Sequence, residues 1–177
     1  MKNTAIKFGA IAGGLLVGFS LVSQAILGTD TSSFEVAEIA GYAGILLSMS
    51  VIYLVVKKYR HEVAGPVGFA QALLVGLVTD LIASILYGLF MLYYFMSLSP
   101  EFLKVYMDYY RGQIETSGAS PEQIASELAA LEANAGLFTN PYFQSMVMFL
   151  TVFAIGAVIA LISAWILRSP SPVGSND

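Results

Sequence analysis

Four long apolar runs constrain this chain more than any other feature. They lie at Phe8–Leu27, Ile39–Val56, Phe69–Leu98 and Phe143–Leu167, and Asp80 is the only charged residue within them. A helix needs roughly 20 residues, at about 1.5 Å rise each, to cross a hydrocarbon core about 30 Å thick. The sequence therefore predicts an all-α membrane protein with four transmembrane helices, over about residues 6–27, 39–56, 69–98 and 143–167.

The composition agrees with a membrane protein and excludes several other classes. Hydrophobic residues make up 57% and charged residues 11% of the 177 residues, far from the soluble averages of about 45–50% and 25%. Four spans and their connections use nearly the whole chain, which predicts one domain over residues 1–177. The net charge of −4 argues against a nucleic-acid partner. The absence of cysteine excludes disulfides and thiolate chemistry.

The basic residues predict the orientation. Short cytoplasmic segments beside spans are enriched in lysine and arginine. With four spans, six of the eight basic residues lie on the side of both termini: Lys2, Lys7, Lys57, Lys58, Arg60 and Arg168. We therefore expect both termini in the cytoplasm, and we expect Lys57, Lys58 and Arg60 to contact anionic lipid headgroups.

The first run has a second interpretation. Lys2 and Lys7, an apolar stretch and then Ser23-Gln24-Ala25 are also typical of a secretory signal with a small-residue cleavage site. An uncleaved helix is favoured, because the apolar stretch exceeds the usual length of about 7–15 residues and continues through Leu27. Cleavage would leave three spans and would not change the orientation of the rest.

The third connection, from Ser99 to about Asn140, is too long to be a simple turn. Ser99-Pro100-Glu101 and Ser120-Pro121-Glu122-Gln123 each place a serine N-cap before proline and an acid, and Gln123 completes a capping box with Ser120. These motifs predict an extramembrane helical hairpin over about residues 100–136, on the non-cytoplasmic side. An apolar stripe on its first helix fits either the hairpin's own core or docking on a membrane or partner: Leu103, Met107, Tyr110 and Ile114. Asn140-Pro141 starts the last span in the same way.

Small residues at four-residue spacing recur along the spans and allow membrane helices to approach closely. The third span carries such a stripe from Gly68 to Gly88, and Asp80 lies within it. The stripe indicates that Asp80 faces other helices. The residues that we expect at helix contacts are Gly9, Gly13, Gly14, Gly18, Ala72, Gly76, Gly156 and Ala160.

Asp80 is the strongest candidate for a functional residue. An ionised acid at mid-membrane costs about 2.5–3.5 kcal/mol on insertion scales, and no span contains a basic residue that could pair with it. We expect a polar site of Asp80, Thr79 and Ser84, with Ser20, Ser23, Gln24, Ser48, Ser50, Thr151 or Ser163 as partners across helices. Three interpretations remain open: a hydrogen-bonded residue that holds the bundle together, a proton or cation site, or a residue that faces lipid.

Signs of catalysis are lacking in the sequence. There is no Gly-rich phosphate loop, HExxH, GxSxG or paired-carboxylate arrangement. His61, the only histidine, lies beside the basic residues of the inner turn and is expected at the surface, without the further ligands that a metal requires. We expect no catalytic residue, no cofactor and no metal.

Several motifs, taken in order, resemble the bacterial membrane family called domain of unknown function 4199. They are Gly41-Tyr42, Lys58-Tyr59-Arg60, Gly65, Phe69-Ala70-Gln71-Ala72 with Gly76, Tyr87-Gly88, Ser117-Gly118-Ala119-Ser120, and Asn140-Pro141 followed by Gly156 and Leu161-Ile162-Ser163. The resemblance runs from Gly41 to Arg168 and implies a multi-pass protein of the bacterial inner membrane. Members often have a Glu and a Pro where this chain has Thr151 and Ala154. The family has no established activity, so the resemblance leaves the function open.

Two functions fit these features. We expect a non-enzymatic membrane assembly or interaction component, which associates with itself or with another membrane protein in the lipid bilayer. The alternative is a small proton- or cation-coupled transporter, or a transporter subunit, that uses Asp80. A transporter needs a polar, hydrated route through the bundle, whereas an assembly protein needs a packed interior and an exposed patch.

Overall fold

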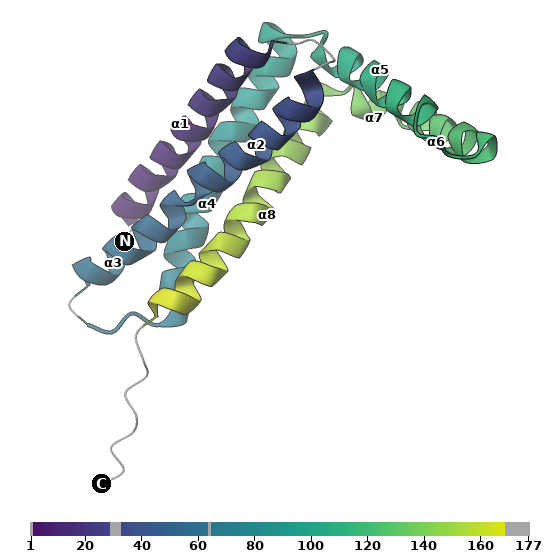
Figure 1. Cartoon of the computed structure of the whole chain (residues 1–177). Coiled ribbons are helices and arrows are strands. Elements are labelled where there is room, and N and C mark those ends of the chain that lie inside the picture. Colours follow the sequence, from purple (N-terminus) through teal and green to yellow (C-terminus); the bar gives the residue numbers. More distant parts are fainter. Residues whose placement is uncertain (1, 29–32, 64, 169–177) are drawn as a thin grey trace.

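Five helices form an elongated bundle, and three more extend from one end of it (Figure 1). A computed structural model describes residues 2–28, 33–63 and 65–168, and no strand occurs in these ranges. The bundle consists of α1 (Lys2–Leu27), α2 (Phe34–Met49), α3 (Val51–Glu62), α4 (Phe69–Tyr93) and α8 (Pro141–Leu167). Four helical stretches within it are long and apolar enough to span a membrane: Asn3–Leu27, Phe34–Glu62, Phe69–Leu98 and Pro141–Leu167. The prediction of an all-α protein with four such helices is confirmed.

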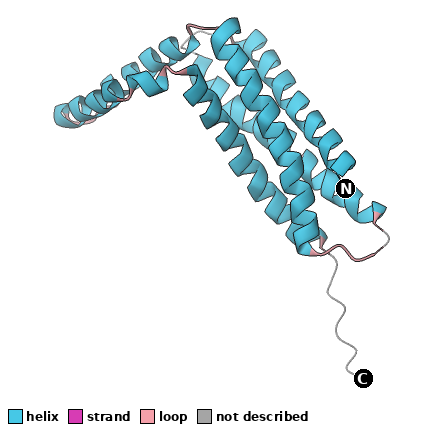
Figure 2. Cartoon of the chain, turned by 180° about the vertical axis from the view of Figure 1, so that it is seen from behind, coloured by secondary structure: helices cyan, strands magenta, loops and turns pink. Residues whose placement is uncertain are grey.

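The spans alternate in direction. The start of α1, the end of α3, the start of α4 and the end of α8 lie at one end of the bundle, and the three extra helices leave from the opposite end (Figures 1 and 2). Since α2 and α3 together form one span, the topology is up-down-up-down. We call the end that carries the extra helices the outer end, in line with the predicted orientation.

The second span is interrupted at Ser50. Its backbone stays in the helical region, with φ −58° and ψ −21°, and its hydroxyl donates a hydrogen bond of 2.6 Å to the carbonyl of Leu47. Serine bonded back to the preceding turn often bends a helix without ending it. The helix begins at Phe34, earlier than the apolar run that starts at Ile39, because hydropathy marks the membrane-embedded part of a helix and not its end.

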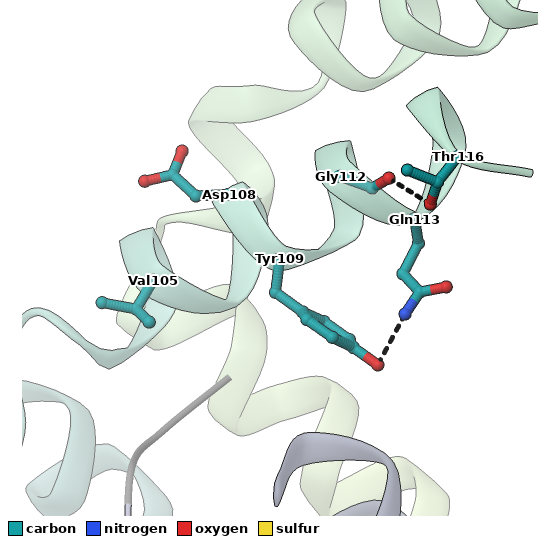
Figure 3. A pocket seen from close by; sticks show the side chains of 6 residues that line it. All are labelled: Val105, Asp108, Tyr109, Gly112, Gln113 and Thr116. Atoms are coloured by element: carbon teal, nitrogen blue, oxygen red, sulfur yellow. Dashed lines mark hydrogen bonds between the residues drawn. The ribbon is translucent and has the colours of Figure 1, made fainter. Parts of the chain in front are cut away.

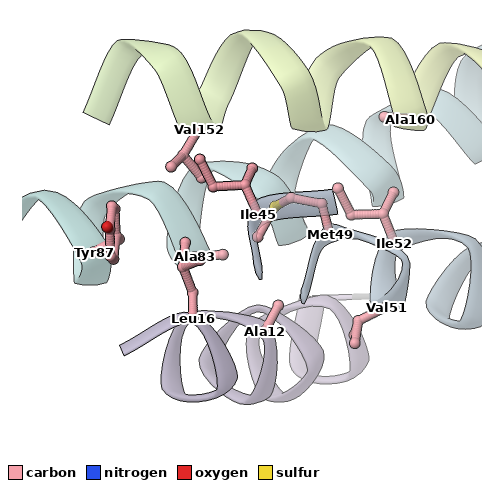
Figure 4. Close-up of a cluster of buried hydrophobic side chains, with 10 residues drawn as sticks. All are labelled: Ala12, Leu16, Ile45, Met49, Val51, Ile52, Ala83, Tyr87, Val152 and Ala160. Atoms are coloured by element: carbon pink, nitrogen blue, oxygen red, sulfur yellow. The ribbon is translucent and has the colours of Figure 1, made fainter. Parts of the chain in front are cut away.

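Buried side chains from all four spans form a continuous core (Figure 4). α4 lies between α1 and α8 and packs on both. The residues of the largest cluster are Ala12, Leu16, Ile45, Met49, Val51, Ile52, Ala83, Tyr87, Val152 and Ala160. Their mixture of small and large side chains lets the helices interdigitate at the density usual for protein interiors.

Close approaches between backbones occur where small residues meet. A Cβ atom added at Gly9 would lie 2.7 Å from the carbonyl oxygen of Thr79, and one at Gly76 would lie 2.8 Å from the Cβ of Ala160. Ala72 is fully buried, and an added Cβ at Gly13 would lie 3.0 Å from the Leu86 side chain. Only hydrogen fits at these glycines without a shift of the neighbouring helix.

Gly14 and Gly18 do not make such contacts. Both are exposed, and an added Cβ at either would find nothing within 4 Å. The prediction that they pack against another helix of this chain is therefore wrong. Each residue turns a helix by about 100°, so Gly14 and Gly18 form a second stripe, rotated away from the Gly9 and Gly13 stripe that faces α4.

The three extra helices form a projecting arm. They are α5 (Phe102–Glu115), α6 (Pro121–Ala133) and the single turn α7 (Ala135–Phe138), and they extend at an angle to the bundle axis (Figures 1 and 2). An ion pair of 3.4 Å between Arg111 and Glu132 joins α5 to α6. We refer to residues 102–138 as the arm.

Two of the three predicted helix starts are confirmed. The Ser120 hydroxyl accepts from the backbone N–H of Gln123 at 3.3 Å, and the Gln123 side chain accepts from the backbone N–H of Ser120 at 3.2 Å, which is a complete capping box. The Asn140 side chain accepts from the backbone N–H groups of Tyr142 and Phe143, at 2.9 and 3.2 Å. Each cap satisfies N–H groups that would otherwise lack an intrahelical partner.

The prediction of an N-cap at Ser99 is wrong. α4 continues into a π-helical turn, η2 (Tyr94–Leu98), which Ser99 ends by donating its N–H to the Tyr94 carbonyl at 2.9 Å. α5 starts at Phe102, without a side-chain cap. The buried rings of Tyr94 and Phe95 explain the extension, because packing of these side chains outweighs the capping preference of the local sequence.

Candidate functional site

Asp80 lies in the middle of α4 and is completely buried. The Ser84 hydroxyl, one turn further along, donates a hydrogen bond of 3.2 Å to its Oδ1 atom. Its Oδ2 atom is buried and has no hydrogen-bond partner among the described residues. Asp80 therefore faces the protein interior, and the interpretation in which it faces lipid is wrong.

The carboxyl group of Asp80 packs directly on the backbone of α8 at Gly156. A Cβ atom added to Gly156 would overlap Oδ1 and Cγ of Asp80 and would lie 2.9 Å from Oδ2. The missing side chain of Gly156 thus makes the space that the carboxyl group occupies. Neither of the two cavities described below includes Asp80 in its lining, so this acid belongs to a helix contact.

Thr79 is not part of the same polar site. Its hydroxyl is also buried, but it donates to the carbonyls of Val75, at 2.8 Å, and Ala5 in α1, at 3.4 Å. Adjacent residues of a helix point about 100° apart, and Thr79 consequently faces α1 while Asp80 faces α8. The predicted group of three is in fact Asp80 with Ser84 alone.

The expected partners of Asp80 on other helices lie elsewhere. Ser20 donates to the carbonyl of Leu16 and the hydroxyl of Tyr87, at 3.0 and 3.3 Å, and Gln24 donates to the hydroxyl of Tyr94. Ser50 is exposed and bonded to Leu47. Ser48 and Ser163 are buried, whereas Ser23 and Thr151 line a cavity at the outer end.

The sequence did not predict this cavity. It has a volume of about 360 Å³ and lies where α1, α2, the end of α4, η2, α5 and α8 meet. Five side chains in its wall are themselves buried: Phe34, Tyr87, Tyr94, Phe95 and Leu103. Since several elements of the bundle and the arm supply its walls, we call it the outer cavity.

Aromatic rings form a ladder along the outer cavity. Consecutive ring centroids from Tyr87 to Phe90, Tyr94, Phe102 and Tyr106 lie 6.2, 6.3, 5.6 and 6.0 Å apart, and all five residues line the cavity. These separations fall within the range of favourable aromatic pairs, about 4.5–7 Å. The ladder joins the interior of the bundle to the arm.

The described part of the outer cavity's wall contains one charged group. This is Glu38, on α2, which accompanies the amides of Gln24 and Gln144 and the hydroxyls of Ser20, Ser23 and Thr151. Burial raises the pKa of Tyr106, and the nearby Glu38 carboxylate raises it further. Tyr106 therefore remains an uncharged hydroxyl, close enough to Glu38 to feel its negative charge.

A second hollow runs along the arm and differs from the outer cavity (Figure 3). Its lining comes from α5 and the residue that follows it: Val105, Asp108, Tyr109, Gly112, Gln113 and Thr116. Gln113 donates to the Tyr109 hydroxyl at 2.9 Å, and Thr116 donates to the Gly112 carbonyl at 2.8 Å. This hollow lies on one helix face, and two of its polar side chains are already bonded within that face, so it is a poor enclosure for a ligand.

The predicted headgroup residues lie at the opposite end of the bundle, near the end of α3. Lys57, Lys58 and Arg60 are exposed. Lys58 also pairs with Glu62 at 3.7 Å and lies 5.6 Å from the ring centroid of Phe8. Their contact with lipid stays a prediction. In the described ranges, no group of three or more His, Cys, Asp or Glu side chains is placed to hold a metal ion.

One family model matches the chain over residues 7–169, and its description is a protein of unknown function, DUF4199. No curated protein and no solved structure is significantly similar to the chain.

Proposed function

We propose, from the premise that this chain belongs to the DUF4199 family of membrane proteins, that it is a non-enzymatic membrane assembly component. The observation that carries the proposal is the arm, which extends beyond the bundle instead of folding back on it (Figure 1). An element with this position reaches molecules beside the protein in the plane of the membrane. The arm packs on the bundle at its base, around Phe102 and Leu103.

The surface of the arm suits a protein partner. Large apolar side chains are exposed at Tyr110 on α5 and at Leu137 and Phe138 on α7, and the acids Asp108 on α5 and Glu122 on α6 are exposed as well. Protein interfaces combine aromatic anchors with a polar rim. We propose that the partner is another membrane protein or a second copy of this chain, and that the arm holds it at the outer membrane surface.

The interior of the bundle supports the same proposal. Asp80 fills the space beside Gly156, and neighbouring helices lie against Gly9 and Gly13 of α1 and Gly76 of α4. Packing of this kind holds a scaffold together, whereas a transport route needs polar groups that line a continuous cavity. The role of Asp80 in this proposal is to fix α4 against α8.

Site-directed photocrosslinking in intact membranes tests the proposal. A benzophenone amino acid replaces Tyr110, on the arm, or Trp165, an exposed residue of α8 at the other end. We expect one discrete protein adduct from position 110 and none from position 165, and its mass distinguishes a second copy from another protein. Equal, diffuse labelling from both positions, or no adduct from position 110, would refute assembly through the arm.

A proton- or cation-coupled transporter that uses Asp80 is the second candidate. The observation that favours it is the buried Oδ2 atom without a partner in the described part of the chain. Purified protein in liposomes that contain a pH-sensitive dye is challenged with proton and sodium gradients. Flux that Asp80→Asn abolishes would support transport. We expect no flux from either protein, and that result would exclude transport under these conditions.

For localisation, we propose the bacterial inner membrane with both termini in the cytoplasm. Lys57, Lys58 and Arg60 lie at the end of the bundle where α1 begins and α8 ends. The arm, with its exposed acids, lies at the other end. This distribution agrees with the enrichment of basic residues on the cytoplasmic side of membrane proteins.

A further inference from the structure

We propose that the outer cavity binds an organic cation: an amine or quaternary ammonium group attached to a small apolar body. This site goes beyond the proposed role of the arm, because it lies inside the junction of arm and bundle. Its volume of about 360 Å³ falls within the range of about 300–1,000 Å³ that is usual for small-molecule sites.

The aromatic ladder is the first reason for a cation. The faces of tyrosine and phenylalanine rings carry negative potential and attract ammonium groups within about 6 Å. The rings of Tyr87, Tyr94 and Phe102 stand in the cavity wall, and the first two are almost fully buried. A ring held by its neighbours at 5.6–6.3 Å loses little side-chain freedom when a ligand binds.

The charge of the lining is the second reason. Among the residues that the structure describes, Glu38 is the only charged one in the cavity wall, and none of the lining residues is a lysine, arginine or histidine. An anionic ligand would meet an uncompensated carboxylate. A purely apolar ligand would gain nothing from Glu38, whereas a cation gains a counter-ion beside aromatic faces.

The position of Glu38 relative to the rings is the third reason. Glu38, Tyr42 and Tyr106 all line the outer cavity, and Glu38 and Tyr42 both act electrostatically on the Tyr106 hydroxyl. A carboxylate that shares a cavity wall with tyrosine rings offers an ammonium group a counter-charge beside aromatic faces. The neighbouring amides of Gln24 and Gln144 offer carbonyl oxygens to N–H groups of a primary amine.

Two sources supply this chemistry. One is a free organic cation from the outer aqueous phase, and the other is the amine headgroup of a phospholipid such as phosphatidylethanolamine. Both would place a positively charged nitrogen among the aromatic rings, so the cavity recognises the cation in either case. Changing the lipid composition of the membrane distinguishes the two sources.

The test uses three probes of one shape. The full chain is placed in nanodiscs of phosphatidylglycerol, which has no amine, and binding is measured by saturation-transfer NMR titration. Benzyltrimethylammonium is the cation, neopentylbenzene is its neutral isostere, and phenylmethanesulfonate is the anion. We expect saturable binding of the cation, partitioning of the neutral compound into lipid that does not saturate, and no binding of the anion.

Matched variants locate the site. Glu38→Gln and Tyr42→Leu change exposed residues of the lining, so both are expected to fold. Each should weaken binding of the cation roughly fivefold, as expected for loss of one exposed charge or aromatic contact. Glu35→Gln on the same helix and Tyr53→Leu on α3 alter residues outside the lining and should leave binding unchanged.

Competition with a lipid distinguishes the two sources of the ligand. If phosphatidylethanolamine added to the nanodiscs competes with the cation probe, the headgroup is the source. If it does not compete, the ligand is a free cation. Equal binding of the cation and its neutral isostere with no effect of Glu38→Gln, or no saturable binding of the cation, would overturn the proposal.

Discussion

The contact between Asp80 and Gly156 makes a sharp prediction for Gly156→Ala. A methyl group at this position would overlap Oδ1 and Cγ of Asp80, well inside an ordinary contact of 3.4–4 Å. To relieve the overlap, α4 and α8 must move apart and the carboxyl group must rotate, which breaks its bond from Ser84. The smallest possible side chain therefore tests whether the two helices touch here.

The magnitude follows from these two responses. Overpacking costs typically about 1–3 kcal/mol, and loss of one hydrogen bond adds about 0.5–1.5 kcal/mol. We expect the free energy of unfolding to fall by about 2–4 kcal/mol. At about 2–4 °C per kcal/mol for a chain of this length, Tm should fall by about 5–15 °C.

The assay is thermal unfolding of the protein in detergent micelles, followed by circular dichroism, with two companion variants. Gly14→Ala adds the same methyl group where nothing lies within 4 Å, and its Tm should stay the same or rise slightly. Adding Asp80→Ala to Gly156→Ala removes the overlap, so the double variant should recover at least about 1 kcal/mol relative to additivity. A native Tm for Gly156→Ala, or strictly additive effects, would refute the contact.

Three further predictions concern topology, packing and the arm. Cysteines placed at Lys58 and Ser117 of this cysteine-free chain should react differently with an impermeant maleimide in intact cells: Ser117 readily and Lys58 hardly at all. The reverse order would contradict the proposed orientation. Gly76→Leu should lower Tm, because even a Cβ would lie 2.8 Å from Ala160; an unchanged melting curve would count against this packing. Ser120→Ala should destabilise α6 by about 0.5–2 kcal/mol, seen as faster hydrogen exchange in α6, and equal exchange would rule out the cap.

The sequence predicted the elements whose causes are local. The length of an uncharged run decides by itself whether the run can span a membrane. The caps at Ser120 and Asn140 depend only on residues within three positions. The orientation of Asp80 toward other helices also follows from its place in a stripe of small residues. Such features need no knowledge of which helix lies opposite.

The remaining features depend on helix pairing. Gly156 opposes Asp80 because α4 and α8 are in contact at one particular register, and the spacing of small residues in either helix does not fix that register. The same is true of Gly14, whose spacing from Gly18 matches that of a packing stripe although no helix of the chain covers it. Six elements line the outer cavity, five of them with aromatic rings, and the density of aromatic residues between Tyr87 and Tyr110 was its only sign in the sequence.

The π-turn at Tyr94–Leu98 is where the third span meets the arm. A π-turn holds one residue more than an α-helical turn. Tyr94 and Phe95 of this turn pack on Phe102, the first residue of α5, with ring centroids 5.6 and 6.0 Å apart. The angle between the arm and the third span therefore depends on ring contacts across one turn of helix, and loss of these rings would free the base of the arm although its own helices were unchanged.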